Sequence, residues 1–165
     1  MGYVPSMPSI SSAKARRTAA RLAAVQALYQ LEMGDGPVGR AVYDLMQLRQ
    51  DDLPEQLVEP DAQLLQAITD GLNARLTDVD DLINGALQGR TLERSEAVLR
   101  AIYRAGAYEL LTDAATPVGV IINDYVNVAH AFFSEGEPAR INAVLDKVAQ
   151  ALGRERGEGA SLSRA

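Results

Sequence analysis

The apolar residues of this chain recur at the three- and four-residue spacing of amphipathic helices, in segments that end at glycine or proline. The first segment begins at Ser12, which can cap the free backbone N–H groups of a helix, and ends at Met33, just before two glycines and a proline. The residues of this segment that are expected to face a core are Leu22, Val25, Leu28 and Tyr29. The sequence therefore predicts one long helix at the start of the fold.

The same spacing predicts about seven helices in all and no convincing strand. The further helices are expected over residues 38–50, from Pro60 onward, behind a Thr77 cap through residue 87, and over 92–111, 117–133 and 137–152. The segment behind Pro117 is rich in β-branched residues, yet its apolar positions also fit one helical face, so we interpret it as a helix. Gly106, which lies between two alanines, indicates a close helix crossing.

Composition agrees with a single helical domain. A chain of 165 residues can bury a core without metals or disulfides. Only 5% of the residues are aromatic and none is Trp, so the core must consist mainly of Leu, Val, Ile and Ala, which favours closely packed helices. We therefore predict an all-α domain over residues 12–152, a flexible extension over 1–11 and a disordered tail over 153–165.

The absence of Cys excludes disulfides, thiolate metal sites and a Cys nucleophile, and it fits a reducing compartment. The N-terminus does not resemble a signal peptide, and no apolar run approaches the roughly 18 residues that a membrane span needs. We therefore expect a cytoplasmic protein without a membrane span.

Candidate catalytic and cofactor sites are few. The only histidine, His130, forms no recognisable nucleophilic motif with a Ser or Cys, and the carboxylate pairs at 51–52 and 80–81 are better explained by capping and solvation. No glycine-rich nucleotide motif is present, and no spaced acidic loop suggests Mg²⁺ or Ca²⁺. The sequence favours a protein that is not an enzyme and needs no cofactor.

Positive charge is concentrated in the first half of the helix predicted at 12–33, although the whole chain has a formal net charge of −6. The four cations are Lys14, Arg16, Arg17 and Arg21, and no acidic residue precedes Glu32. A solvated helix face is the simplest explanation. However, cations at a helix N-terminus are unfavourable by roughly 0.3–1 kcal/mol each, so stability does not account for their position. Because arginine suits bidentate contact with phosphate, and nothing resembles a DNA-recognition helix-turn-helix, RNA is the favoured ligand.

Four blocks of the sequence follow a known order. They are R-R-T-A-A-R-L-A-A-V-Q-A-L-Y-Q (16–30), R-A-G-A-Y-E-L-L (104–111), P-V-G-V-I-I-N-D-Y-V-N-V-A-H-A-F (117–132) and I-N-A-V-L-D-K (141–147). With these blocks the chain resembles the NusB family of transcription antitermination factors over about residues 14–152. The resemblance implies two packed three-helix bundles and binding of boxA RNA. It also implies partnership with NusE, the ribosomal small-subunit protein, in helping RNA polymerase read through terminators, notably in ribosomal RNA operons.

The resemblance further implies which residues contact RNA. Arg17 and Arg21 occupy positions of the family's arginine-rich RNA-binding motif, and Lys14 and Arg16 extend it. Thr18 and Ala19 stand where further arginines can occur, so the motif is sparser here.

A second implied RNA contact lies at the start of the last predicted helix, where Asn142 and Asp146 belong to the family's N-G-V-L-D block. Two residues depart from the family pattern there, since Arg140 replaces an aromatic residue and Ala143 replaces glycine. Loss of an aromatic base-stacking platform costs about 1–3 kcal/mol, whereas the new arginine can contact phosphate. For the NusE-binding face, the expected residues are Glu96, Arg100 and Arg104.

Two alternatives to an antitermination factor stay open from the sequence. The same fold occurs as an appended domain of RNA methyltransferases, so the chain could be a non-catalytic RNA-binding module that acts with such an enzyme. It could also be a structural helical homodimer in which pairing covers the arginine-rich face.

Overall fold

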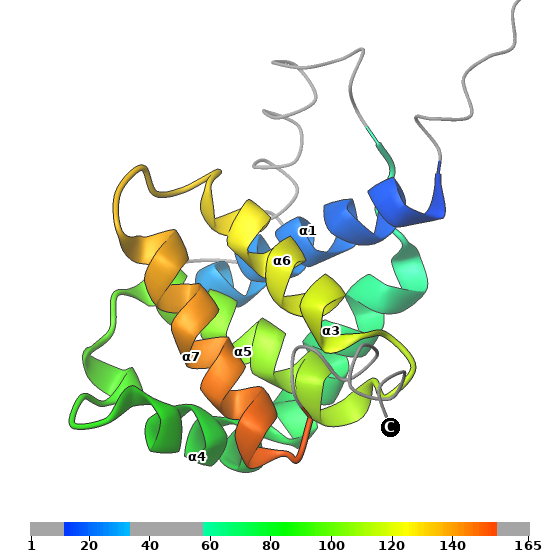
Figure 1. Ribbon diagram of the computed structural model, residues 1–165. Helices are drawn as coiled ribbons and strands as arrows, with labels where there is room; N and C mark the ends of the chain where they lie inside the picture. Colours follow the sequence, from blue (N-terminus) through cyan, green and yellow to red (C-terminus); the bar gives the residue numbers. More distant parts are fainter. Residues whose placement is uncertain (1–11, 34–57, 155–165) are drawn as a thin grey trace, which may run out of the picture.

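The computed structural model describes residues 12–33 and 58–154, and these ranges contain helices and no strand (Figure 1). The elements are α1 (Ala13–Met33), α3 (Ala62–Ala74), α4 (Leu76–Leu87), the 3-10 helix η2 (Leu92–Arg94), α5 (Ala97–Thr112), α6 (Val118–Ala129) and α7 (Glu137–Ala151). The predicted all-α class is confirmed. The helix predicted over 38–50, the extension over 1–11 and the tail beyond residue 154 lie outside the described residues.

Helix α5 lies at the centre of the described part and packs against each of the other five α-helices (Figure 1). Helices α1 and α3 pack on α5 and on each other. On the other side, α7 packs on α5 and also on α4 and α6. Most side chains of α5 are therefore buried, among them Ile102, Ala105 and Leu110. The described helices form two packed groups that share α5, in agreement with the predicted arrangement of two bundles.

Helix α1 approaches its neighbours mainly through small side chains. Its buried apolar residues are Ala20, Ala23, Ala24 and Val25. Of the four residues predicted to face the core, only Val25 is fully buried; Leu22 and Leu28 are partly buried at the edge of the core, and Tyr29 is half-buried. Because alanine keeps the helix surface narrow, α1 can lie close to α5.

Two glycines allow equally close contacts elsewhere. A Cβ atom at Gly106 would lie 2.8 Å from Cδ1 of Leu145, so the close crossing predicted at Gly106 is confirmed, with α7 as the partner. Gly71 of α3 makes room for the phenol ring of Tyr108, because a Cβ at this position would overlap the ring.

The helix predicted over 92–111 is interrupted, which corrects that prediction. Residues Leu92–Arg94 form a 3-10 turn, and Ser95 is extended before α5 begins. Arg100 explains the break, because its Nη1 donates hydrogen bonds to the carbonyl oxygens of Leu92 (3.2 Å) and Glu93 (3.0 Å) and to that of Ser95. The side chain thus satisfies carbonyl groups that a continuous helix would have bonded internally.

Several helix ends also test the sequence predictions. The Ser12 hydroxyl accepts the N–H of Ala15 at 3.1 Å, so the predicted cap of the first helix is confirmed. Thr77 is not a cap, since α4 already begins at Leu76. The helix behind Pro117 is confirmed, although it ends at Ala129 rather than near residue 133.

The tail over 153–165 was predicted to be disordered, but its first residues are fixed to the domain. Nη1 of Arg154 donates to the carbonyl oxygens of Leu110 (2.8 Å) and Asp113 (2.9 Å), and Nη2 donates to that of Thr116 (2.8 Å). These bonds tie the end of α7 to the connection between α5 and α6.

Candidate nucleic-acid interface

The first turns of α1 carry an exposed group of cations. Lys14 and Arg16 are exposed and Arg17 is half-buried. The first turn of α1 contains no acidic residue. Within residues 12–33 and 58–154, no carboxylate forms an ion pair with any of these three side chains. Their charge therefore adds to the positive end of the helix dipole and is available to an external anion.

Arg21, the fourth predicted RNA-contacting cation, is only 2% exposed. Its Nε and Nη2 donate to the two carboxylate oxygens of Glu109, each at 2.7 Å, and its Nη1 donates to Asp124 Oδ2 at 2.8 Å. The guanidinium carbon lies 5.9 Å from the centre of the Tyr125 ring. The structure thus corrects the expectation that Arg21 shares the exposed face of α1, because its guanidinium is enclosed between α5 and α6.

The groups around Arg21 complete a buried polar cluster. The Tyr125 hydroxyl donates to Glu109 Oε2, and the Thr18 hydroxyl donates to Asp124 Oδ1 at 3.0 Å. Burial alone would lower the pKa of Arg21, but hydrogen bonding to Glu109 and the charge of Glu109 outweigh it and raise this pKa. Burial and the negative charge of Glu109 raise the pKa of Tyr125, so this phenol stays protonated. The cluster fixes the rotation of α1 and thereby the direction in which Lys14, Arg16 and Arg17 point.

Glu109 and Asp124 were not predicted as site residues. Both lie inside sequence blocks that carry the family resemblance, and each interrupts a largely apolar helix face. A carboxylate in such a position is expected to need a buried partner. That signal points to an internal ion pair, but the sequence alone does not identify Arg21 as the partner.

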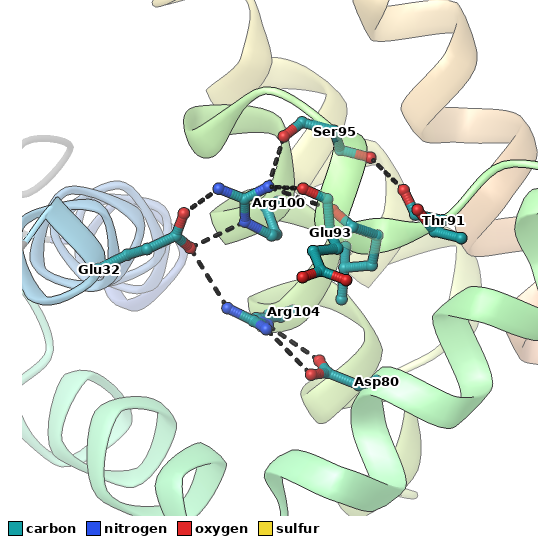
Figure 2. A network of polar contacts seen from close by, with 8 residues as sticks. Glu32, Asp80, Thr91, Glu93, Ser95, Arg100 and Arg104 are labelled. Atoms are coloured by element: carbon teal, nitrogen blue, oxygen red, sulfur yellow. Dashed lines mark hydrogen bonds and ion pairs between the residues drawn. The ribbon is translucent and has the colours of Figure 1, made fainter.

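The expected NusE-binding residues Arg100 and Arg104 belong to a second polar network (Figure 2). Glu32, near the end of α1, receives hydrogen bonds from Nε of Arg100 (2.9 Å) and Nη1 of Arg104 (3.3 Å), and it also pairs with Nη2 of Arg100. Arg104 in addition forms a bidentate pair with Asp80 of α4, with both N–O distances 2.9 Å. The hydrogen bond from Arg100 lowers the pKa of Glu32, and the same bond raises the pKa of Arg100.

This network joins the end of α1 to α4, η2 and α5. Glu96, the third expected partner-binding residue, is exposed at the start of α5 and makes no capping hydrogen bond. Arg100 and Arg104 therefore already have internal partners, while Glu96 is accessible.

The start of α7 lies at the other end of α5 from the cations of α1. Because Arg21 pairs with Glu109 while Glu32 pairs with Arg100, α1 and α5 run antiparallel. Arg140 is exposed and lies beside Tyr103, which precedes Glu109 on α5 by six residues, and Arg16 precedes Arg21 on α1 by five residues. Because Arg21 pairs with Glu109, the helical rise over these two stretches separates Arg140 from Arg16 by roughly 15 Å along α5. Figure 1 shows the beginnings of α1 and α7 on opposite sides of the domain.

The other residues of the I-N-A-V-L-D block lie along α7. Asn142 is half-buried, Ala143 is exposed, and Asp146 accepts a hydrogen bond from the Gln150 side chain at 3.2 Å. The structure therefore groups Lys14, Arg16 and Arg17 in one place and puts Arg140 in another, with Asn142 on the same helix as Arg140.

Two further findings concern the described ranges only. They contain no group of three or more His, Asp and Glu side chains that could hold a metal ion. None of their helices is both long enough and apolar enough to cross a membrane.

Comparison with known proteins decides the family. The model of the NusB family matches residues 18–150, which include all six described α-helices in whole or in large part. The chain belongs to the NusB family. The match begins within α1, so it includes Thr18 and Arg21 of the buried cluster but not Lys14, Arg16 and Arg17.

Individual NusB proteins match over nearly their whole length. The transcription antitermination protein NusB of Allorhizobium ampelinum is 43% identical over 146 residues, which cover 87% of this chain and 91% of that protein. The NusB protein of Agrobacterium fabrum is 40% identical over 160 residues, covering 95% of this chain and 94% of that protein.

Solved NusB structures share the fold. T. maritima NusB superposes with a TM-score of 0.65 at 25% identity, covering 81% of this chain and 90% of that chain. A crystal structure of the antitermination factors NusB and NusE in complex with dsRNA gives a TM-score of 0.65 at 20% identity, with 82% and 97% covered. At this identity the second comparison supports the fold alone.

Proposed function

We propose that this NusB-family chain is a cytoplasmic, non-enzymatic transcription antitermination factor that binds boxA-type RNA together with NusE and acts on RNA polymerase. Family membership supports the general role, since the relatives at 40–43% identity are transcription antitermination proteins. The observation that carries the RNA-binding part is the group of cations at the start of α1, which form no ion pair among the described residues, on a chain whose formal net charge is −6.

The proposed RNA-binding surface consists of Lys14, Arg16 and Arg17. All three belong to the first two turns of a helix that the Arg21 cluster holds in a fixed orientation. Phosphate groups of a single strand would gain from both the side-chain charges and the helix N-terminus. Arg21 is left out of this surface, because contact with RNA would require its buried ion pairs to open.

The proposed NusE-binding surface includes Glu96, with Arg100 and Arg104 beside it. Because these two arginines are held by Glu32 and Asp80, we assign them first to shaping the surface and to placing η2. Glu96 is the exposed residue of this set, so its carboxylate is available to a basic side chain of the partner.

A pulldown tests the proposal as a whole. Tagged full-length protein is mixed with NusE in the presence of a boxA oligonucleotide or of a scrambled one. We expect a ternary complex with boxA RNA and much less RNA in the scrambled control. Light scattering on the same samples tests the homodimer alternative, because a dimer that persists with RNA and recruits neither RNA nor NusE would contradict the proposal.

A further inference from the structure

A groove of about 600 Å³ lies between the ends of α1 and α3. Its apolar wall consists of leucine and alanine side chains, namely Leu28 and Leu31 of α1, Leu72 of α3, Leu76 at the start of α4 and Ala101 of α5. Glu32 and Arg104 also line the groove, but they are already paired with each other and with other residues in the network of Figure 2. The groove therefore offers a mainly apolar surface.

Large apolar side chains are exposed at this groove. Leu31 is 53% exposed and Leu76 is 36% exposed, and both line it. Met33, the last residue of α1, is 45% exposed. In the part of the chain that the structure describes, the other large apolar side chains that are exposed are Val120 and Phe132, which belong to a different region. Such a gathering of apolar side chains indicates a surface that another segment or molecule covers.

The course of the chain indicates which segment covers the groove. The backbone N–H of Asp61, just before α3, donates to the carbonyl oxygen of Arg16 at 2.9 Å, so α3 begins beside the first turns of α1 (Figure 1). Both helices also end at the groove, so they run parallel. After Met33 the chain must therefore return along α1 before α3 can begin. At 1.5 Å per residue, the helix from Arg16 to Met33 is about 26 Å long.

Residues 34–57, which lie outside the described residues, make this return. Gly34, Gly36 and Pro37 favour a turn directly after α1, at the end that borders the groove. The helix predicted over 38–50 would be about 20 Å long, which matches most of the return. Its apolar residues Val42 and Leu45 are three positions apart and share one face. An amphipathic helix needs an apolar partner for such a face, and the groove lies where this segment begins.

Charge agrees with the same course. Asp70 lines the groove, is exposed and forms no ion pair with any residue in the ranges 12–33 and 58–154. A helix over 38–50 that runs antiparallel to α1 brings Arg40, in its first turn, to the end of α3 where Asp70 lies. An exposed ion pair of this kind contributes little stability, so the apolar contact is the main term.

We infer that residues 38–50 form a helix that runs antiparallel to α1 and packs Val42 and Leu45 against the groove between α1 and α3. The groove is then an internal docking surface of this chain and not the binding site of a separate partner. This inference does not depend on the proposed function.

Spin labelling tests the position of the segment in the full-length protein. The chain has no Cys, so one introduced cysteine places a nitroxide label at a single position. Ala74→Cys is exposed and lies next to Asn73 of the groove without lining it. Gln150→Cys is also exposed but lies on α7, which packs on α4, α5 and α6, and it is the matched control. We expect the label at position 74 to broaden the backbone amide NMR signals of residues 38–42, and the label at position 150 to leave them sharp.

A pair of substitutions tests the apolar contact independently. Val42→Asp places a charge on the face that is proposed to meet the groove, whereas Gln47→Asp places the same charge about 140° away on the predicted helix. We expect Val42→Asp to lower the urea midpoint by about 1 M, because an apolar side chain that is buried in the fold is replaced by a carboxylate. Gln47→Asp should stay close to wild type. Equal midpoints for the two variants would overturn the inference.

Other occupants of the groove give different results. In a mixture of spin-labelled molecules and isotope-labelled molecules, broadening that passes between molecules would identify a second copy of the chain and overturn the inference. Loss of the broadening at residues 38–42 when purified NusE is added would assign the groove to that partner and overturn it too. So would sharp signals of residues 38–42 with the label at position 74. None of these results depends on RNA binding, so the proposed function is tested separately.

Discussion

Arg21 of α1 forms a buried, bidentate ion pair with Glu109 of α5, with both N–O distances 2.7 Å. Each of the two side chains is at most 3% exposed. Such a pair contributes little net stability relative to well-packed apolar residues, but removing one partner leaves a charge buried without compensation. The pair therefore acts mainly by specifying one orientation of α1 on α5.

We predict that Arg21→Ala lowers the free energy of unfolding by about 3–5 kcal/mol, because Glu109 and Asp124 both lose their counter-charge in the core. Urea denaturation followed by circular dichroism measures this change. Arg17→Ala, on the neighbouring half-buried position without an ion pair among the described residues, is the control and should stay within about 0.5 kcal/mol of wild type. Equal stability of the two variants would contradict the assignment of Arg21 to the core.

The arginine-rich segment shows how far the sequence leads. Charge and periodicity predict correctly that α1 is a helix with a cationic start and a packed second half. They do not distinguish the buried Arg21 from the half-buried Arg17, because both residues belong to the same arginine-rich segment. The difference between them depends on which face of α1 packs against α5 and α6. That face is defined by Glu109 and Asp124, which lie far away in the sequence.

The break before α5 illustrates a second limit. Residues 92–96 have no strong helix-breaking residue, so local propensity favours a continuous helix. The side-chain hydrogen bonds from Arg100 to three backbone carbonyls, which lie five to eight residues earlier in the chain, override that propensity. By contrast, the close crossing at Gly106 was predictable. A glycine between alanines lowers the stability of a helix, so it is expected where a larger side chain would not fit against a neighbouring helix.

Acid should weaken the network at Glu32. Its pKa is lowered below the ordinary value of 4.5 by the hydrogen bond from Arg100. A group whose pKa is lower in the folded state stabilises the protein above its unfolded pKa, and this contribution is lost as pH falls through the folded value. We therefore predict that Glu32→Gln is less stable than wild type at pH 7, and that the difference shrinks between about pH 5 and pH 3.

Urea denaturation of wild type and Glu32→Gln at several pH values measures this convergence. Other carboxylates with lowered pKa values, such as Asp113, contribute to both proteins and cancel in the difference. A stability difference that stays constant down to pH 3 would show that Arg100 does not stabilise the ionised carboxylate of Glu32.

Two glycine substitutions should have opposite effects. Gly106→Ala places a Cβ 2.8 Å from a methyl group of the buried Leu145, so we predict a loss of about 1–3 kcal/mol through overpacking. Gly85→Ala lies in α4, where a Cβ meets nothing within 4 Å, and should raise stability by about 0.5–1 kcal/mol through helix propensity. Thermal unfolding of both variants gives the comparison, and a stabilised Gly106→Ala variant would contradict the close packing of α5 on α7.

The proposed RNA-binding surface is tested most directly by the salt dependence of RNA affinity. The double variant Arg16→Gln, Arg17→Gln is compared with wild type and with Arg75→Gln, which removes an exposed arginine between α3 and α4, outside the proposed surface. Binding is measured with a labelled single-stranded boxA oligonucleotide at several salt concentrations. If both arginines bind phosphate, the slope of log K against log salt becomes shallower by about 1.4, at about 0.7 for each phosphate that is no longer neutralised on a single strand. The unfolding free energy and the Arg75→Gln slope should not change. Wild-type affinity and slope in the double variant would contradict the account.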